Sequence, residues 1–245
     1  MEQTCYVRLE IRGTGQILVP VTVSDEPWKG DLAVTGPEAV TPRRIMDAAR
    51  RKIGLPLPIG ETERHFLREL SEEDLPAIRE LKLWETDEKL LGASAGQLCD
   101  AAFLHSYIRN QYPLFGFGIW GVFVKNSPDG TGGEAGDGAG TLAGLAGFGM
   151  PEEETDTDTD TEGIPELGYY IAPPFRRKGY AEEACRLCLL YAGEELGLEE
   201  VLLRVRKENR ASLMLGKKLL QTGIHPCGQE TEEKQRSAAV RLILI

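Results

Sequence analysis

Residues 166–181 constrain this chain more than any other segment, because they join an apolar strand to a helix through a cationic turn. The apolar run from Leu167 to Ala172 predicts a strand, and two prolines and three consecutive cations follow it. A helix is then predicted from Ala181 to Leu196. Backbone amides at a helix N-terminus have no intrahelical acceptor and carry the positive end of the helix dipole. The segment therefore predicts a turn that binds a pyrophosphate.

The side chains of this turn suit an anion. Gly179 has no Cβ atom, so the backbone can approach a bulky anion closely or adopt a positive φ angle. Arg176, Arg177 and Lys178 supply the opposite charge. The sequence contains neither the P-loop pattern nor a G-x-G-x-x-G that opens a helix after a strand, so another kind of phosphate site is expected. Residues 176–181 are called the phosphate turn below.

The pattern Arg176-x-x-Gly179-x-Ala181 resembles the [Q/R]-x-x-G-x-[G/A] acetyl-CoA signature of the GNAT superfamily of N-acetyltransferases. The order downstream is similar too, since a strand is predicted over 201–206 and another helix opens at 208–212. An ordinary turn between a strand and a helix, with a solvated basic patch, is the alternative explanation. Within the superfamily, the residues of this motif resemble most those of the subgroup that acetylates the N-termini of ribosomal proteins.

The resemblance covers residues 63–245 and implies an α+β GNAT fold. Its sheet is mixed and mostly antiparallel, is flanked by helices, and has a fourth and a fifth strand that splay apart. The earlier elements are expected as strands over Thr62–Leu70, Phe115–Val124 and Thr141–Met150 and as helices after Ser71 and over Ala95–Asn110.

Residues 1–60 lie outside the resemblance. Strands over Tyr6–Arg12 and Ile17–Val23, joined near Gly13, predict a β-hairpin. Thr41 and Pro42 are typical of a helix start, and the helix should run to about Lys52. This extension either packs on or dimerises the catalytic domain, or is a separate binding module.

The resemblance also implies which residues bind acetyl-CoA. A backbone amide near Tyr170 or Ile171 would polarise the thioester carbonyl, and the pantetheine arm would bind the strand end. The expected cofactor-binding residues are Ile171, Ala172, Arg176, Arg177, Lys178, Gly179, Tyr180, Ala181 and Asn209.

The catalytic roles are less determined by the resemblance. Glu166 lies at the mouth of the fourth strand, where it is either a base acting through water or a solvated carboxylate. Asn209 matches an asparagine that the family usually carries. Seven residues after that asparagine the family often has a tyrosine that acts as the acid, but this chain has Gly216 at that position. Ser212, Tyr169 or Tyr170 could replace it, or Ser212 is only a hydroxyl at a helix start.

The implied function is direct transfer of an acetyl group from acetyl-CoA to a primary amine, on a protein N-terminus, a lysine or a small molecule. The alternatives are a non-catalytic acyl-CoA-binding or regulatory protein on the same scaffold, and an enzyme that uses a longer acyl-CoA. No metal cofactor is expected, because Cys185 and Cys188 lie one turn apart in a predicted helix and favour core packing.

Charge and composition limit the location and the partners. Residues 126–165 hold ten of the acidic residues and no lysine or arginine, so the net charge of −11 is concentrated there. Flexible acidic loops are expected over 126–140 and 151–164. Five cysteines and the lack of a signal peptide or a long apolar run favour a cytoplasmic protein without a membrane partner. We also expect no nucleic-acid partner, and a monomer or a homodimer.

Overall fold

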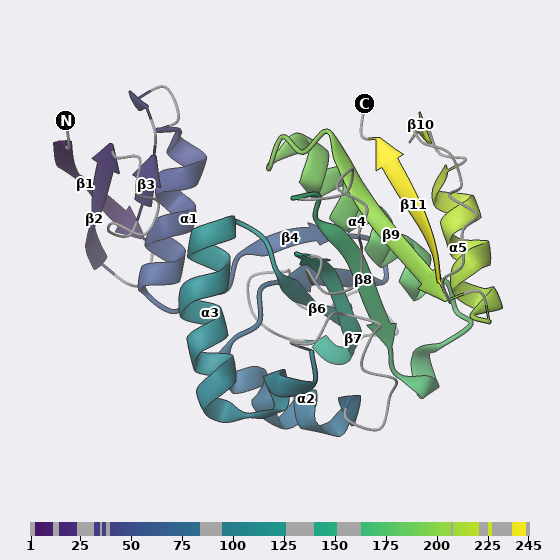
Figure 1. Ribbon diagram of the computed structural model, residues 1–245. Coiled ribbons are helices and arrows are strands. Elements are labelled where there is room, and N and C mark those ends of the chain that lie inside the picture. The colour runs from purple at the N-terminus through teal and green to yellow at the C-terminus, as the bar shows by residue number, and fades with distance from the viewer. Residues whose placement is uncertain are drawn as a thin grey trace.

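The chain forms a large sheet covered by helices on both faces and a smaller N-terminal sheet beside it (Figure 1). The computed structural model describes residues 3–11, 15–23, 32–34, 36–37, 40–83, 95–125, 140–150, 163–206, 208–220, 225–226 and 237–243. The acidic loops predicted around 126–140 and 151–164 fall almost wholly outside these ranges. None of the helices in these ranges combines enough length with enough apolar sequence to pass through a lipid bilayer.

The main sheet has eight strands in the order β10-β11-β9-β8-β7-β6-β5-β4. All neighbouring pairs are antiparallel except β8 and β9, which run parallel, so the predicted mixed α+β sheet is confirmed. The strands are β4 (Pro58–Glu61), β5 (His65–Arg68), β6 (Ile119–Lys125), β7 (Gly140–Gly149), β8 (Glu166–Ile171), β9 (Glu200–Arg206), β10 (His225–Pro226) and β11 (Ser237–Ile243).

The helices divide between the two faces of the main sheet. Buried residues of α4 pack with Trp120 and Phe148 on one face, and α2 and the first half of α3 pack with Phe66 and Leu145 on the other. Cys185 and Cys188 of α4 are fully buried, as predicted for core residues. The helical segments are η2 (Glu72–Asp74), α2 (Leu75–Glu80), η5 (Gly96–Cys99), α3 (Ala101–Phe115), η8 (Pro173–Phe175), α4 (Tyr180–Glu194) and α5 (Arg210–Leu220).

A buried ion pair joins β5 to η2. Arg68 donates from both terminal nitrogens to the carboxylate of Asp74, each at 2.8 Å, and the two side chains are only 6% and 8% exposed. The same carboxylate accepts from the backbone amide and the hydroxyl of Ser71. The two opposite charges are thus paired and compensate each other, although Nε of Arg68 has no hydrogen-bond partner among the described residues.

Two predicted boundaries were wrong. The strand expected from Phe115 begins at Ile119, because α3 continues to Phe115. Asp100 caps the start of α3 by accepting from an amide at 2.9 Å, and Gly116 ends it with a φ of 73°. The strand expected over Thr62–Leu70 is shorter, and β4 precedes it in the main sheet. Pro58 opens β4 at the sheet edge, where a missing amide is tolerated.

The N-terminal segment forms a module with its own core. β1 (Gln3–Ile11) and β2 (Gly15–Val23) make the predicted hairpin, and β3 (Leu32–Val34) adds a parallel strand that was not predicted. α1 (Pro42–Lys52) begins as predicted, since the Thr41 side chain accepts from the amide of Arg44. Its buried alanines pack on β2, and Figure 1 shows the module beside α3.

Candidate active site

β8 and β9 pair only where they begin. Their register joins Glu166 to Leu202, and the amide of Leu202 donates to the carbonyl of Pro165 at 2.8 Å. β8 runs on to Ile171 and β9 to Arg206, and within the described residues no further pairing joins the two strands. The strands part toward their C-terminal ends, which confirms the predicted splay.

One set of β8 backbone groups faces β7. The amide of Ala172 donates to the carbonyl of Ala143 at 2.8 Å, just beyond the end of the β7–β8 register. Hydrogen-bonded and non-hydrogen-bonded pairs alternate along an antiparallel ladder, so Tyr170 shares this orientation. The backbone amides of Ala172 and Tyr170 are therefore directed into the sheet.

The other set faces the gap between β8 and β9. The carbonyl of Pro165 points to β9, and the same alternation directs the backbone groups of Tyr169 and Ile171 to that side. The side chain of Arg176 donates to the carbonyl of Ile171 at 2.7 Å, which agrees with this orientation. Tyr169 and Ile171 thus present amides where the strands have separated.

The phosphate turn follows β8 and η8. Arg177 and Gly179 have φ angles of 62° and 90° in this turn. Among the described residues, no hydrogen-bond acceptor lies within reach of the amides of Gly179, Tyr180 and Ala181. These amides open α4, a helix of fifteen residues, so they form a site suited to a phosphate group.

The three cations of the turn differ in position. The guanidinium of Arg176 lies back against the end of β8, bound to Ile171 and 5.6 Å from the ring of Tyr170. Arg177 and Lys178 are exposed, and the Lys178 ammonium lies 5.8 Å from the ring of Phe175. Arg176 therefore contacts the end of β8, whereas Arg177 and Lys178 lie at the surface beside the free amides.

Arg64, in the turn between β4 and β5, is a neighbour of the phosphate turn that the sequence did not reveal. It donates to the carbonyl of Lys178 at 3.0 Å, forms an ion pair with Glu183 and lies 4.7 Å from the ring centre of Tyr180. A Cβ atom placed on Gly179 would lie 3.2 Å from its terminal nitrogen. No local motif marks this arginine, because its contacts cross more than a hundred residues of sequence.

Thr62, His65 and Glu183 form a polar cluster between β5 and the first turn of α4. The Thr62 hydroxyl donates to Glu183 at 3.2 Å, and Nδ1 of His65 lies 2.9 Å from the Thr62 oxygen and 3.3 Å from the carboxylate. His65 is completely buried, and this burial lowers the pKa of its imidazole. The cluster links the main sheet to the helix that carries the free amides.

On the α5 side, the hydroxyls of Tyr169 and Ser212 lie 2.7 Å apart. Burial raises the pKa of Tyr169 to about 12, although its hydrogen bond with Ser212 opposes this change. Asn209 accepts from the amide of Ser212 at 3.1 Å, so it caps α5. This places a protonated phenol on the strand whose amide faces the gap.

The comparisons with known proteins agree with this geometry. Residues 64–219 match the model of the acetyltransferase (GNAT) domain family, which is more than half of the chain. The chain belongs to the GNAT acetyltransferase family. It is accordingly an acetyl-CoA-dependent acyltransferase.

Solved structures show the same fold at low identity. An acetyltransferase from Agrobacterium tumefaciens is 20% identical with a TM-score of 0.51, over 76% of this chain and 92% of that one. An acetyltransferase of the GNAT family from Bacillus anthracis is 16% identical with a TM-score of 0.50, over 76% and 98%. RimL, the ribosomal L7/L12 alpha-N-protein acetyltransferase, in complex with coenzyme A, is 13% identical with a TM-score of 0.53, over 77% and 98%.

Gly216, which stands where GNAT proteins often have a tyrosine, is closely packed. Gly216 is buried on α5, and a Cβ atom there would lie 3.2 Å from a methyl carbon of Leu203 in β9. A larger residue at this position would require the Leu203 side chain to shift. If an acid acts in this GNAT protein, it must come from a residue other than Gly216.

The other expected catalytic residues lie in different surroundings. Glu166 is half-buried where β8 and β9 meet, and its carboxylate lies 3.5 Å from Nε of Arg204. The hydroxyl of Tyr170 is buried on the opposite face and donates to the carbonyl of Leu81 at 3.1 Å. The structure therefore brings Tyr169 and Ser212 together and keeps the Tyr170 side chain away from them.

Proposed function

We propose that this GNAT protein transfers the acetyl group of acetyl-CoA directly to a primary amine. The amine belongs to a protein N-terminus, a lysine or a small molecule. The observation that carries the proposal is the combination of three free amides at the start of α4 with two parted strands that lead to it.

Acetyl-CoA supplies an acetyl group activated as a thioester. The free amides of Gly179, Tyr180 and Ala181 would bind its pyrophosphate, with Arg177 and Lys178 adding charge. The amides of Tyr169 and Ile171 would bind the pantetheine and hold the thioester carbonyl, because both face the gap. The absence of a side chain at Gly179 fits this close approach of the backbone.

Two groups would handle protons. An α-amino group has a pKa of about 8 and a lysine of about 10.4, so the acceptor must lose a proton before it attacks. Glu166 would accept that proton through water at the point where β8 and β9 meet, and Arg204 would orient its carboxylate. Tyr169, which keeps its proton at neutral pH, would donate to the departing sulfur and be oriented by Ser212.

The test combines binding and turnover on the full chain. Calorimetry should detect CoA binding, and thiol release from acetyl-CoA should depend on a member of a panel of peptide N-termini, lysine peptides and small amines. Comparing peptides that differ only in a free or a blocked α-amino group assigns the acceptor. Absence of CoA binding would refute the proposed use of the phosphate turn.

The alternative of a non-catalytic acyl-CoA-binding protein does not follow for a member of this acyltransferase family. Gly216 bears only on which residue is the acid, because the tyrosine common in the family is missing there. Tight CoA binding without acetyl transfer to any amine of the panel would contradict the proposed class of acceptor.

A further inference from the structure

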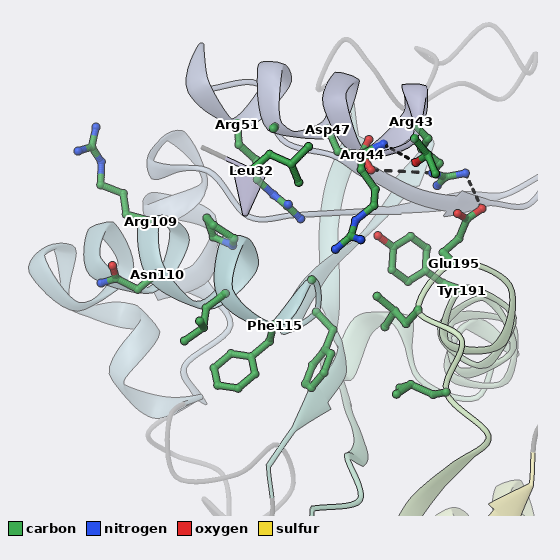
Figure 2. A pocket seen from close by; sticks show the side chains of 18 residues that line it. Leu32, Arg43, Arg44, Asp47, Arg51, Arg109, Asn110, Phe115, Tyr191 and Glu195 are labelled. Carbon is green, nitrogen blue, oxygen red and sulfur yellow. Dashed lines mark hydrogen bonds and ion pairs between the residues drawn. The ribbon is translucent and has the colours of Figure 1, made fainter. Parts of the chain in front are cut away.

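A pocket of about 690 Å³ lies between the N-terminal module and the acetyltransferase domain (Figure 2). α1 and β3 form one wall, and the C-terminal parts of α3 and α4 form the other. The family match starts at residue 64, so the module that forms the first wall lies outside it. The pocket is thus a feature of this chain that the family domain alone does not create.

The pocket is separate from the phosphate turn. Tyr191, which lines it, lies eleven residues beyond Tyr180 on α4. At a rise of 1.5 Å per residue the two positions are about 16 Å apart along the helix axis. An occupant of the pocket therefore does not compete for the free amides at the start of α4.

The walls combine cationic and apolar surface. Four arginines line the pocket, three of them from α1, against two carboxylates, those of Asp47 and Glu195. Arg43 pairs with Glu195, and Arg51 pairs with Glu69, which lies outside the lining. Counted over the lining alone, the positive charges exceed the negative charges. The apolar part comes from Leu114, Phe115, Phe117, Leu196 and Leu198. Leu114 and Phe115 are 41% and 43% exposed, so this apolar wall is accessible from solvent.

Tyr191 supplies the polar group that indicates a ligand. The residue is only 7% exposed, and its ring packs edge-on against Trp120 with 5.2 Å between the ring centres. Within the described part of the chain, the hydroxyl of Tyr191 has no hydrogen-bond partner, and it is open to the pocket that the residue lines, so it can donate to an occupant. Figure 2 shows Tyr191 and Arg44 reaching into the pocket from opposite walls.

The protonation state of this phenol suits an anion. Burial raises the pKa of Tyr191 to about 12, so the hydroxyl is a neutral donor at physiological pH. A phenol and a guanidinium that face one space can both donate to one carboxylate. The apolar wall on the α3 side then needs a ring or a chain to cover it.

We propose that this pocket binds a small organic carboxylate, with its charge at Tyr191 and Arg44 and its apolar body on the α3 and α4 wall. The volume is in the range of small-molecule sites. The ligand is recognised by its single negative charge joined to an aromatic or aliphatic group, and the N-terminal module supplies the cationic half of its site.

The test uses naphthoate as the probe and naphthamide as its neutral analogue of the same shape, each titrated into the full chain by calorimetry. We expect naphthoate to bind at least tenfold more tightly than naphthamide, and Tyr191→Phe and Arg44→Gln each to weaken naphthoate about tenfold. Tyr191→Phe keeps the ring against Trp120, so the fold is preserved. Arg8→Gln, which removes a charge from an exposed site on β1, should leave the affinity unchanged.

Two further measurements distinguish this site from others. Leu114→Glu, at an exposed position of the apolar wall, should also weaken naphthoate, by repulsion. Saturating CoA should not displace the probe, whether or not the chain acetylates amines. Equal binding of naphthoate and naphthamide, no binding of either, unchanged affinity in Tyr191→Phe and Leu114→Glu, or displacement by CoA would each overturn the proposal.

Discussion

Replacing Gly179 with leucine tests the role assigned to the phosphate turn. Gly179 has a φ of 90°, and a side chain in the left-handed region costs about 1–2 kcal/mol of folding free energy. Its Cβ atom would start 3.2 Å from the terminal nitrogen of Arg64, a flexible group that can move. The fold should therefore survive, with a loss of stability set mainly by the backbone.

The effect on the cofactor should be larger and separable. An amide that donates to a phosphate is worth about 1.5–3 kcal/mol, so losing one such bond raises the Kd for CoA roughly 10- to 150-fold. A leucine side chain at Gly179 would occupy the surface of the turn and keep the phosphate from at least one of the three free amides.

Gly197 provides a matched control. Its φ is 64°, no atom lies within 4 Å of a Cβ placed there, and it follows the C-terminal end of α4. Gly197→Leu should lose similar stability in urea unfolding but keep the wild-type affinity for CoA in calorimetry at fixed salt. If Gly179→Leu and Gly197→Leu bind CoA equally well, the phosphates bind elsewhere and the argument fails.

Four other perturbations have defined outcomes. Glu166→Gln should lower kcat about 100-fold at neutral pH, and the loss should shrink as rising pH deprotonates the amine without help; a loss independent of pH would indicate positioning instead. Tyr169→Phe should lower kcat while leaving the Kd for CoA within about twofold, and an unchanged kcat would remove Tyr169 as the acid. Asp74→Ala leaves Arg68 buried without its partner, so the free energy of unfolding measured in urea should fall by about 3–5 kcal/mol, whereas a fall below 1 kcal/mol would mean that water reaches the guanidinium. Because burial lowers the pKa of His65, the unfolded chain binds its proton first, and stability should decline as pH falls below about 6.5; His65→Gln should reduce that decline, and an equal decline would assign it to other groups.

Local sequence was sufficient for the elements that local physics controls. Thr41 with Pro42 marked the start of α1, and the run after Thr141 marked β7 to within a residue. The predicted order of strand, cationic turn and helix around Gly179 was also correct. A helix start, a positive φ angle and a cluster of cations each depend only on neighbouring residues of the sequence. The family resemblance then supplied the mixed sheet with its splayed fourth and fifth strands, which periodicity alone does not determine.

Boundaries that depend on competing signals were less predictable. Phe115 and Phe117 are apolar like the β6 residues that follow them, so the strand was expected to begin at Phe115. Instead, α3 continues to Phe115 and ends at Gly116. β10 and β11 were not predicted, and neither was the parallel strand β3. A strand is stabilised by its neighbours in the sheet, which a single sequence does not reveal.

The sequence by itself determined that a helix begins at a glycine beside three cations, and hence where a phosphate can bind. Only the tertiary structure placed Arg64 against the carbonyl of Lys178, 114 residues away, and the hydroxyl of Tyr169 against that of Ser212, 43 residues away. It likewise brought α1 and α4 to opposite sides of one pocket. The physical reason is that a turn is governed by its own backbone and side chains, whereas contacts between distant segments follow from strand order and register, which the packing of the whole core selects.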